Sequence, residues 1–223
     1  PVGMVVHEDE SGDSDTLINR IKSYLYRKGE YHPENELSFA PALCNRIDRN
    51  TCGIVIAAKN AESLRILNQK IRDRELTKLY LCIACGKVTP DSATLTAYLE
   101  KNSDTNTVKI SDKKTKSNLT IKTKYKVIAY NGENSLLKVD LLTGRTHQIR
   151  AHLAYIGHAL LGDGKYGNNK LNKKYGFKYQ TLCSYELQFK FTTDAGCLSY
   201  LDGKCFKAKA PDFVKMFGGN IKL

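Results

Sequence analysis

The 223-residue sequence contains no hydrophobic run close to the roughly 18 residues that cross a bilayer. It also lacks the charged, apolar and small-residue succession of a secretory signal peptide. No GxSxG nucleophile motif occurs, and no glycine-rich stretch leads into the Lys-Ser/Thr pair of a P-loop. We therefore expect a cytoplasmic protein that does not enter the membrane. Because the sequence begins at Pro1 instead of methionine, we also expect the natural N-terminus to lie upstream.

Acidic residues are scarce relative to basic ones. Lys and Arg total 35 against 23 Asp and Glu, which gives a formal net charge of +12 and a pI near 9.3. Hydrophobic residues make up 41% of the chain, so it is expected to fold and not to be disordered. The excess positive charge favours a polyanionic partner, either nucleic acid or an anionic membrane. A basic protein without such a partner is the alternative.

The cysteine and histidine residues do not form a metal-binding pattern. Seven cysteines are an odd number in a chain too long to need disulfide cross-links, which fits a reducing compartment. Cys82 and Cys85 resemble half of a zinc site, but no second CxxC follows, and residues three apart in a strand point to opposite faces. His147 and His152 are five apart, unlike the i, i+4 pair of a zinc-protease helix. We predict structural cysteines and no metal site.

The spacing of apolar residues predicts a few helices among many strands. Helices are expected from Asp15 to Gly29, after Asn60, from near Thr146 to Gly157, and around 211–217. Strands are expected at 53–59, 77–87, 119–127, 135–142, 181–191, 197–201 and 204–209, with surface loops at 109–118 and 165–178. This order indicates an α+β fold with a mixed, largely antiparallel central sheet.

A lone carboxylate, Asp48, lies between Arg46 and Arg49, just before the apolar run 53–58. A carboxylate flanked by cations stays ionised and is suited to act as a nucleophile or a base. The alternative is a structural Asp–Arg pair of the common kind. The stretch therefore predicts a catalytic carboxylate only if further functional residues accompany it.

A second polar stretch, about a hundred residues later, surrounds a predicted helix start. It contains Arg145, His147, Gln148 and Arg150. Because a helix N-terminus adds its own partial positive charge, this group is suited to stabilise a carboxylate or to bind phosphate. A merely solvated helix start is the alternative, which the density of polar groups disfavours.

Two lysine-rich segments favour an RNA partner. Residues 109–126 hold seven lysines and one acid, and residues 165–178 hold five lysines and no acid, with tyrosine and phenylalanine between them. Lysines bind phosphates and aromatic rings stack on bases, although either segment is equally compatible with a solvated face. The glycines of 162–167 match GxGxxG, but without the amphipathic helix that a dinucleotide site requires.

Four ordered blocks of the sequence resemble the RluA-type pseudouridine synthases. Residues 45–53 resemble their HRLDRxTSG signature, and 141–167 resemble a later, more specific motif with its continuation. Residues 77–80 match a short tyrosine motif, and 1–7 resemble the start of the family domain. We accordingly treat 1–223 as one catalytic domain, without the upstream S4-type RNA-binding domain of many members.

The resemblance implies that uridine in RNA is isomerised to pseudouridine without metal or cofactor. It assigns catalysis to Asp48, with Tyr80 contacting the target base and Arg150 pairing with Asp48 in a cleft between two lobes. Arg46 would enter the RNA where the base leaves. Asn45 and Cys52 replace the usual His and Ser. RNA contacts are expected at Arg46, Arg49, Arg145, His147, Gln148, Lys165, Lys170, Lys173 and Lys174.

The most favoured substrate is large-subunit ribosomal RNA, with transfer RNA as an alternative. A non-catalytic RNA-binding protein that keeps the fold is a further alternative, although such a protein has no need of a carboxylate in a basic groove. A nucleotide-dependent RNA modifier is a third. We expect a monomer.

Overall fold

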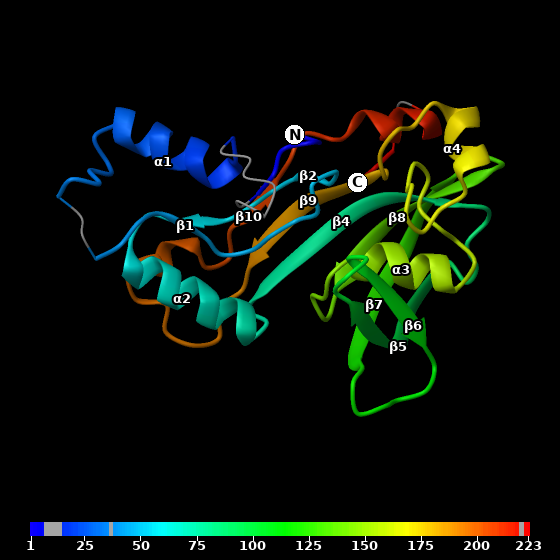
Figure 1. The fold of residues 1–223 in the computed structure, drawn as a ribbon, viewed down its shortest axis with the longest axis horizontal. Coiled ribbons are helices and arrows are strands. Elements are labelled where there is room, and N and C mark those ends of the chain that lie inside the picture. The colour runs from blue at the N-terminus through cyan, green and yellow to red at the C-terminus, as the bar shows by residue number, and fades with distance from the viewer. Residues whose placement is uncertain (7–14, 36–37, 219–220) are drawn as a thin grey trace. The chain divides into compact units, whose positions relative to one another are not determined.

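The computed structural model of the chain describes residues 1–6, 15–35, 38–218 and 221–223. These residues form two compact units, shown in Figure 1. Unit 1 contains Pro1–Thr77 and Glu186–Ala208, and unit 2 contains Lys78–Tyr185 and Lys209–Leu223. No helix in the described part of the chain is both long and apolar enough to span a membrane.

Unit 2 is built on an antiparallel sheet. Its strands lie in the order β4 (Leu76–Cys85), β8 (Asn134–Leu141), β7 (Leu119–Tyr130), β5 (Ser92–Asn102) and β6 (Thr107–Ser111). The backbone before β9 (Leu182–Phe189) continues the sheet beyond β4, because the Ile83 N–H donates to the Thr181 carbonyl at 3.2 Å. The predicted α+β fold with a largely antiparallel sheet and few helices is confirmed.

The hairpin of β7 and β8 forms as the sequence predicts. The Asn131 side chain accepts the backbone N–H of Asn134 at 2.8 Å, and Gly132 has a φ of 93° that favours glycine. In β7, Ile121, Thr123 and Tyr125 are buried, while the lysines between them are exposed. This alternation gives the sheet one packed face and one polar face.

Helix α3 (Gln148–Tyr155) packs on the buried face of this sheet. Ile149 and Leu153 join a cluster that includes Tyr80 of β4 and Val139 of β8. The helix begins two residues later than predicted, because His147 has a left-handed φ of 52° and stands before the first turn. The predicted helix is therefore confirmed, although its expected start near Thr146 lies two residues too early.

Two further predictions for unit 2 are wrong. The segment expected to be a loop at 165–178 contains α4 (Asn169–Tyr175), a polar helix whose first N–H groups are capped by the Asn168 side chain. The helix is fixed by a buried amide instead of an apolar face: Asn172 accepts the Gly162 N–H and donates to the Asp163 carbonyl. The expected loop at 109–118 begins inside β6.

Unit 1 holds two amphipathic helices. Helix α2 (Ala61–Arg72) is capped by Asn60, as predicted. Helix α1 (Leu17–Arg27) is capped by Thr16, whereas Asp15 instead forms an ion pair with Arg20. Both helices confirm the helical spacing of their apolar residues.

The short strands of unit 1 differ from prediction. The expected strand at 53–59 divides into β2 (Cys52–Gly53) and β3 (Ala57–Ala58), and β3 pairs with β1 (Ala42–Leu43). Strand β10 (Cys205–Lys207) pairs with the end of β9, as expected. The expected strand at 197–201 is a 3₁₀ helix (Gly196–Leu201), and a second 3₁₀ helix (Asp212–Phe217) in unit 2 ends the chain's regular structure.

A buried ion pair ties α2 to the chain after β9. The Lys70 ammonium donates to Glu75 at 2.7 Å and to the Thr193 carbonyl at 2.6 Å. The Lys70 hydrogen bond, with others from Thr192 and Thr193, lowers the pKa of Glu75 to about 2 despite its burial. Because every buried charge here has partners, the pair is a structural feature of unit 1.

Candidate active site

Asp48 lies in unit 1, on a turn fixed by backbone hydrogen bonds. The Thr51 N–H donates to the Asp48 carbonyl at 2.8 Å, and the Gly3 N–H donates to the Arg49 carbonyl at 2.9 Å. Asp48 is half-buried, while Arg46 and Arg49 are exposed on either side of it. The carboxylate is therefore presented from a rigid turn with two accessible cations beside it in sequence.

Asn45 has a structural role in this turn. Its side-chain oxygen accepts the Ile56 N–H at 2.8 Å, and the neighbouring Cys44 N–H donates to the Ile56 carbonyl at 2.8 Å. The residue that replaces the usual His therefore has a backbone hydrogen bond of its own. His7, the last residue of the first family-like block, lies outside the described residues.

Arg150 lies in unit 2 and is clamped by Asp163. Its Nε donates to Oδ2 of Asp163 at 2.7 Å and its Nη2 donates to Oδ1 at 3.0 Å, and both side chains are buried. Burial alone would raise the pKa of Asp163, but the Arg150 guanidinium and the N–H groups of Lys165 and Tyr166 outweigh it and lower the pKa. Asp163 therefore stays ionised and fixes the direction of the guanidinium.

Tyr166 completes this arrangement. The Arg150 guanidinium carbon lies 5.3 Å from the centre of the Tyr166 ring, in a cation–π contact. The phenol oxygen accepts the Val108 N–H of β6 at 2.9 Å and lies 2.9 Å from Nδ1 of His147. One tyrosine thus connects the start of α3, the arginine of its first turn and strand β6.

Glycines on both sides of Asp163 allow the turn that holds it. A Cβ at Gly162 would lie 2.1 Å from the Tyr179 carbonyl oxygen, and one at Gly167 would lie 2.4 Å from the Asp163 carbonyl oxygen. Close backbone packing therefore explains Gly162 and Gly167 of the GxGxxG match, whereas Gly164 has open space around it. Asp163 was not predicted from the sequence, where its one signal was a carboxylate between glycines in the family-like block.

Gln148, predicted to bind RNA, is buried with its amide fully engaged. It donates to the Lys122 carbonyl at 3.1 Å and to the Thr123 hydroxyl at 3.0 Å. Its oxygen accepts the Arg145 N–H at 3.1 Å and the Thr143 hydroxyl at 2.9 Å. These four bonds give Gln148 a structural role at the start of α3 and leave the RNA prediction without support.

Tyr80 lies in β4 with 6% of its surface exposed, on the face of the sheet that α3 covers. His152 of α3 is also buried, with Nδ1 3.0 Å from the hydroxyl of Thr123 in β7. Burial lowers the pKa of His152 to about 4, so the ring is neutral near pH 7. His152 therefore contributes packing and a hydrogen bond, with no charge.

Apart from Arg46 and Arg49, the predicted RNA-binding cations belong to unit 2. Arg145, Lys170 and Lys173 are exposed, whereas Lys165 donates to the Asn106 carbonyl at 2.8 Å. Lys174 pairs with Glu133 at 3.0 Å. Among the predicted residues, the structure joins His147 and Arg150 to Tyr166 through side-chain contacts. Lys165 takes part in the same network through its backbone N–H.

The catalytic predictions fall in different units. Asp48 belongs to unit 1, and Tyr80 and Arg150 belong to unit 2. The pairing of Asp48 with Arg150, and the cleft around them, accordingly stay predictions. Each of the two partners is nonetheless held in a definite local geometry of its own.

Within the described ranges, no three His, Cys, Asp or Glu residues lie close enough together to hold a metal ion. Cys82 is fully buried, and burial raises the pKa of its thiol, which fits a structural cysteine. None of the seven cysteines is part of a disulfide within the described residues.

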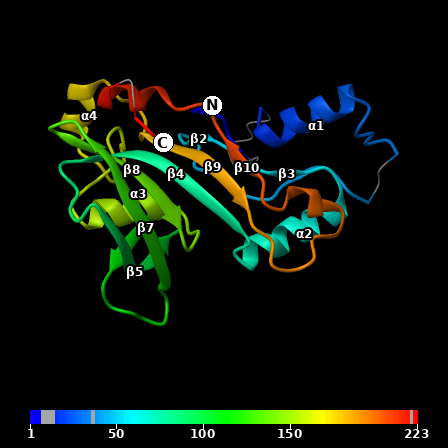
Figure 2. The ribbon, with the colours of Figure 1, turned by 180° about the vertical axis from the view of Figure 1, so that it is seen from behind.

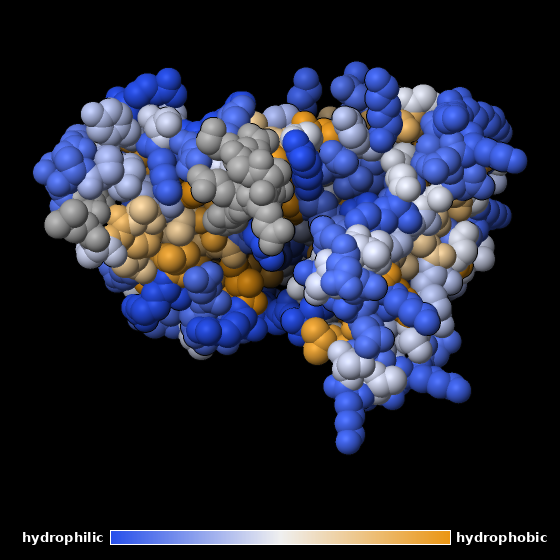
Figure 3. Space-filling model, viewed as in Figure 1, coloured by the Kyte–Doolittle hydropathy of each residue, from blue (hydrophilic) through white to orange (hydrophobic). Residues whose placement is uncertain are grey.

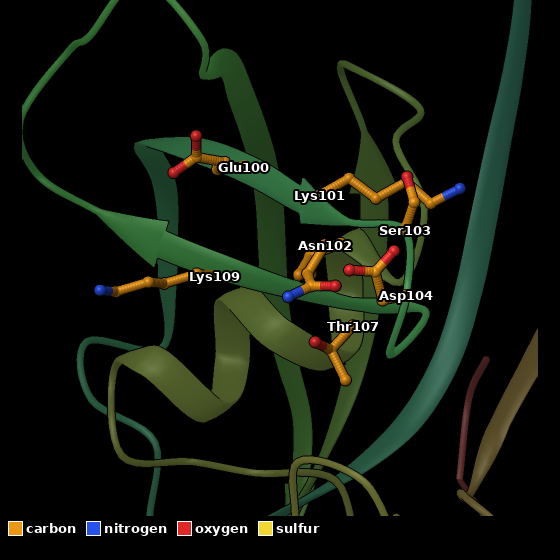
Figure 4. Close-up of a pocket in the computed structure, with 8 residues that line it drawn as sticks. Glu100, Lys101, Asn102, Ser103, Asp104, Thr107 and Lys109 are labelled. Carbon is orange, nitrogen blue, oxygen red and sulfur yellow. The ribbon is translucent and has the colours of Figure 1, made fainter.

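A polar hollow of about 530 Å³ lies at the end of the β5–β6 hairpin, lined by residues 100–104 and 107–109. Figure 4 shows the side chains of Lys101 and Lys109 pointing away from each other there. None of the predicted catalytic residues lines this hollow, which we regard as a feature of the hairpin and not as the active site.

Comparison with known proteins identifies the family. Residues 1–155 match the family model described as RNA pseudouridylate synthase. An uncharacterized RNA pseudouridine synthase of Mycoplasma genitalium is 35% identical over 196 residues, covering 85% of this chain and 58% of that protein. The ribosomal large subunit pseudouridine synthase D of Borreliella burgdorferi is 32% identical over 167 residues, covering 75% of this chain and 50% of that protein.

The fold is also similar to that of a solved structure. The solved structure of human RNA Pseudouridylate Synthase Domain Containing 4 has a TM-score of 0.72 at 19% identity, covering 97% of this chain and 85% of that one. The structure and the sequence matches define an α+β domain of an RNA-modifying family. The chain belongs to the RluA-type family of RNA pseudouridine synthases. It spans between half and three fifths of the length of the two curated relatives.

Proposed function

We propose that this chain isomerises uridine to pseudouridine in RNA, with Asp48 as the catalytic carboxylate. The observation that carries the proposal is Asp48 itself, a half-buried carboxylate on a hydrogen-bonded turn, at the position of the family's catalytic aspartate. The family match over residues 1–155 includes this turn. A purely RNA-binding domain would gain nothing from a carboxylate between two arginines, because it repels phosphate.

The reaction exchanges one bond for another within the same nucleotide. The N1–C1′ bond breaks, a C5–C1′ bond forms, the C5 proton leaves and N1 gains a proton. Atoms and electrons balance without an oxidant or a second substrate. Asp48 would act at the sugar, at the base or as a proton acceptor, and each of these roles requires the ionised form.

The other residues would bind and orient the RNA. The target base must leave its stack, at a cost of a few kcal/mol, and we propose that the exposed Arg46 fills the gap. Tyr80 would contact the base. Arg150 would keep Asp48 ionised, and its clamp by Asp163 supports a fixed direction for the guanidinium.

We further propose large-subunit ribosomal RNA as the substrate. Two relatives are named ribosomal large subunit pseudouridine synthase, D in Borreliella burgdorferi and C in Vibrio cholerae, at 32% and 30% identity. The seven cysteines, none of which forms a disulfide in the described residues, support action in a reducing compartment such as the cytoplasm.

The test uses RNA labelled with tritium at C5 of uridine, because this hydrogen is released when the new bond forms. The chain is incubated with large-subunit ribosomal RNA fragments or transfer RNA transcripts, in EDTA and without added nucleotide. We expect tritium release from ribosomal RNA. Release from transfer RNA alone would overturn the substrate assignment, and release from neither would overturn the proposed function.

A further inference from the structure

The sheet of unit 2 has two different faces. Tyr80, Tyr125 and Val139 point to the face that α3 covers. The alternate residues of β7, Lys122, Lys124 and Lys126, point to the opposite face and are exposed. Figure 2 shows β7 and β5 from this side, with α3 behind them. A row of three cations therefore lies on a part of the sheet that is open to solvent.

Each of these lysines lies directly across from a hydroxyl group. The register of β5 and β7 pairs Ser92 with Lys126, Thr94 with Lys124 and Thr96 with Lys122, and all three hydroxyl residues are exposed. Because alternate residues of a strand are about 7 Å apart, the pairs form a regular ladder. An ammonium and a neighbouring hydroxyl are the donors that bind a backbone phosphate. We call these six residues the lysine–hydroxyl face.

One acid stands beside this row of three cations, because Asp140 of β8 lies across from Lys124. Within the described parts of the chain, no hydrogen bond or ion pair holds the ammonium groups of Lys122, Lys124 and Lys126. Some other exposed lysines do have acidic partners, as in the pairs Lys59–Glu30, Lys174–Glu133 and Lys215–Asp212.

The surrounding strands keep the balance positive. These strands carry two more lysines, Lys138 across from Lys126 and Lys109 on β6. The acids beside them are Asp140 and Glu100. Glu100 is engaged by the Ser117 hydroxyl at 2.6 Å. The view in Figure 3, from the α3 side, shows hydrophilic residues over most of unit 2 and a hydrophobic band between α1 and α2 in unit 1. The face of unit 2 seen in this view is thus also largely polar.

We propose that the lysine–hydroxyl face is a second RNA-contact surface, and that the substrate is a folded RNA large enough to reach both faces of the sheet. The inference rests on the proposed function, because Tyr80 and the α3 arginine are on the other face. An RNA that brings a uridine to Tyr80 must pass around the sheet to place phosphates on Lys122–Lys126. A short single strand cannot occupy both places at once.

The main experiment compares two triple variants. Lys122, Lys124 and Lys126 are changed to Gln, and the matched control changes the exposed Lys190, Lys204 and Lys209 to Gln. Binding is titrated with salt for a folded large-subunit ribosomal RNA fragment and for a short single strand with the same target uridine. Thermal unfolding verifies that both variants fold.

The expected result is specific to the folded RNA. Its affinity for the first variant falls at least tenfold, and the slope of log affinity on log salt flattens by roughly 0.7 to 0.9 per lost contact. The short strand binds unchanged, and the control variant behaves like the wild type. Equal slopes for the two triple variants, or equal weakening for both RNAs, would overturn the inference.

A second pair of variants tests the hydroxyls without changing charge. Thr94→Val and Thr96→Val together should weaken the folded RNA a few-fold and leave the salt slope unchanged, because the lost donors are neutral. Unchanged affinity would contradict the ladder. Binding of anionic lipid vesicles that depends on the lysines, with RNA binding unaffected, would assign the face to a membrane instead.

The two proposals fail separately. The binding titrations are repeated with Asp48→Asn, where catalysis does not enter. If the wild type forms pseudouridine while the lysine variants bind folded RNA normally, only the second surface is wrong. If the wild type modifies no RNA, the proposed function is wrong, whatever the lysines bind.

Discussion

Asp163 is the single residue on which the local geometry of unit 2 depends most. It is fully buried, accepts two bonds from Arg150, and accepts the N–H groups of Lys165 and Tyr166 at 2.8 and 3.1 Å. Removing its charge leaves a buried guanidinium without a counter-ion. The residue therefore affects both folding and, through Arg150, the direction of a proposed catalytic cation.

We predict that Asp163→Asn lowers the free energy of unfolding by about 3–5 kcal/mol, the usual cost of breaking a buried ion pair. Pseudouridine formation should fall at least tenfold, with RNA affinity little changed. Urea unfolding and tritium release measure the two effects, with the exposed Asp104→Asn as control.

A double variant separates positioning from stability. If Asp163 acts through Arg150, adding Arg150→Gln to Asp163→Asn should recover part of the lost stability without recovering activity, because the unpaired charge is gone. Full activity in the folded Asp163→Asn protein would contradict the positioning role.

The lowered pKa of the buried His152 leads to a prediction of how the free energy of unfolding depends on pH. Its folded pKa of about 4 lies below the ordinary value of 6.5, so the unfolded chain binds more protons between these values. The stabilisation is complete above pH 6.5 and is lost as pH falls towards 4, up to roughly 3 kcal/mol at 1.4 kcal/mol per pKa unit. Denaturation from pH 7 to 5 should show a shallower loss for His152→Gln than for the wild type and the His32→Gln control. Identical profiles for all three would contradict this assignment.

At the scale of elements, the sequence was informative where local chemistry decides the structure. Asn60 caps α2, Asn131-Gly132 turns β7 into β8, and the lysines of β7 alternate with buried residues. Each of these features depends on neighbours in sequence. The pattern of side chains is therefore sufficient to predict them.

Elements fixed by distant contacts were not predictable in this way. Helix α4 has no apolar stripe that would predict it, since a buried amide, Asn172, holds it to the turn at Gly162 instead. The start of α3 is displaced because the backbone of His147 is left-handed. Gln148 accepts a hydrogen bond from the Arg145 N–H just before it, and the Tyr166 hydroxyl lies within hydrogen-bond distance of the His147 ring. Strand β5 was not identified, although it joins β6 and β7.

The lysines of α4 give a prediction for one element. Changing Lys170, Lys173 and Lys174 to Gln should weaken all RNAs alike and flatten the salt dependence, by up to about 0.7 per lost contact on single strands. Lys174 already pairs with Glu133, so its share should be the smallest. Turnover at saturating RNA should change little. Parallel salt titrations for variant and wild type would show that α4 is only a solvated surface.

At the scale of the whole molecule, the residues predicted for the site come from distant parts of the sequence and from both units. Asp48, Tyr80 and Arg150 were assigned from separate blocks, and the structure gives each a defined local setting. The sequence did not reveal the support behind them: Asp163 and the full engagement of Gln148 depend on contacts across unit 2. Catalytic side chains have a local signature, whereas the residues that hold them are found only in the fold.

The central claim, that Asp48 carries out uridine isomerisation, is tested most directly by single-turnover tritium release at saturating RNA. The proteins compared are the wild type, Asp48→Asn and the exposed Asp104→Asn, each with RNA affinity and thermal unfolding measured in parallel. We predict that Asp48→Asn binds and folds like the wild type but releases tritium at least about a hundredfold more slowly, while Asp104→Asn is unaffected. Release by Asp48→Asn at the wild-type rate would contradict the account.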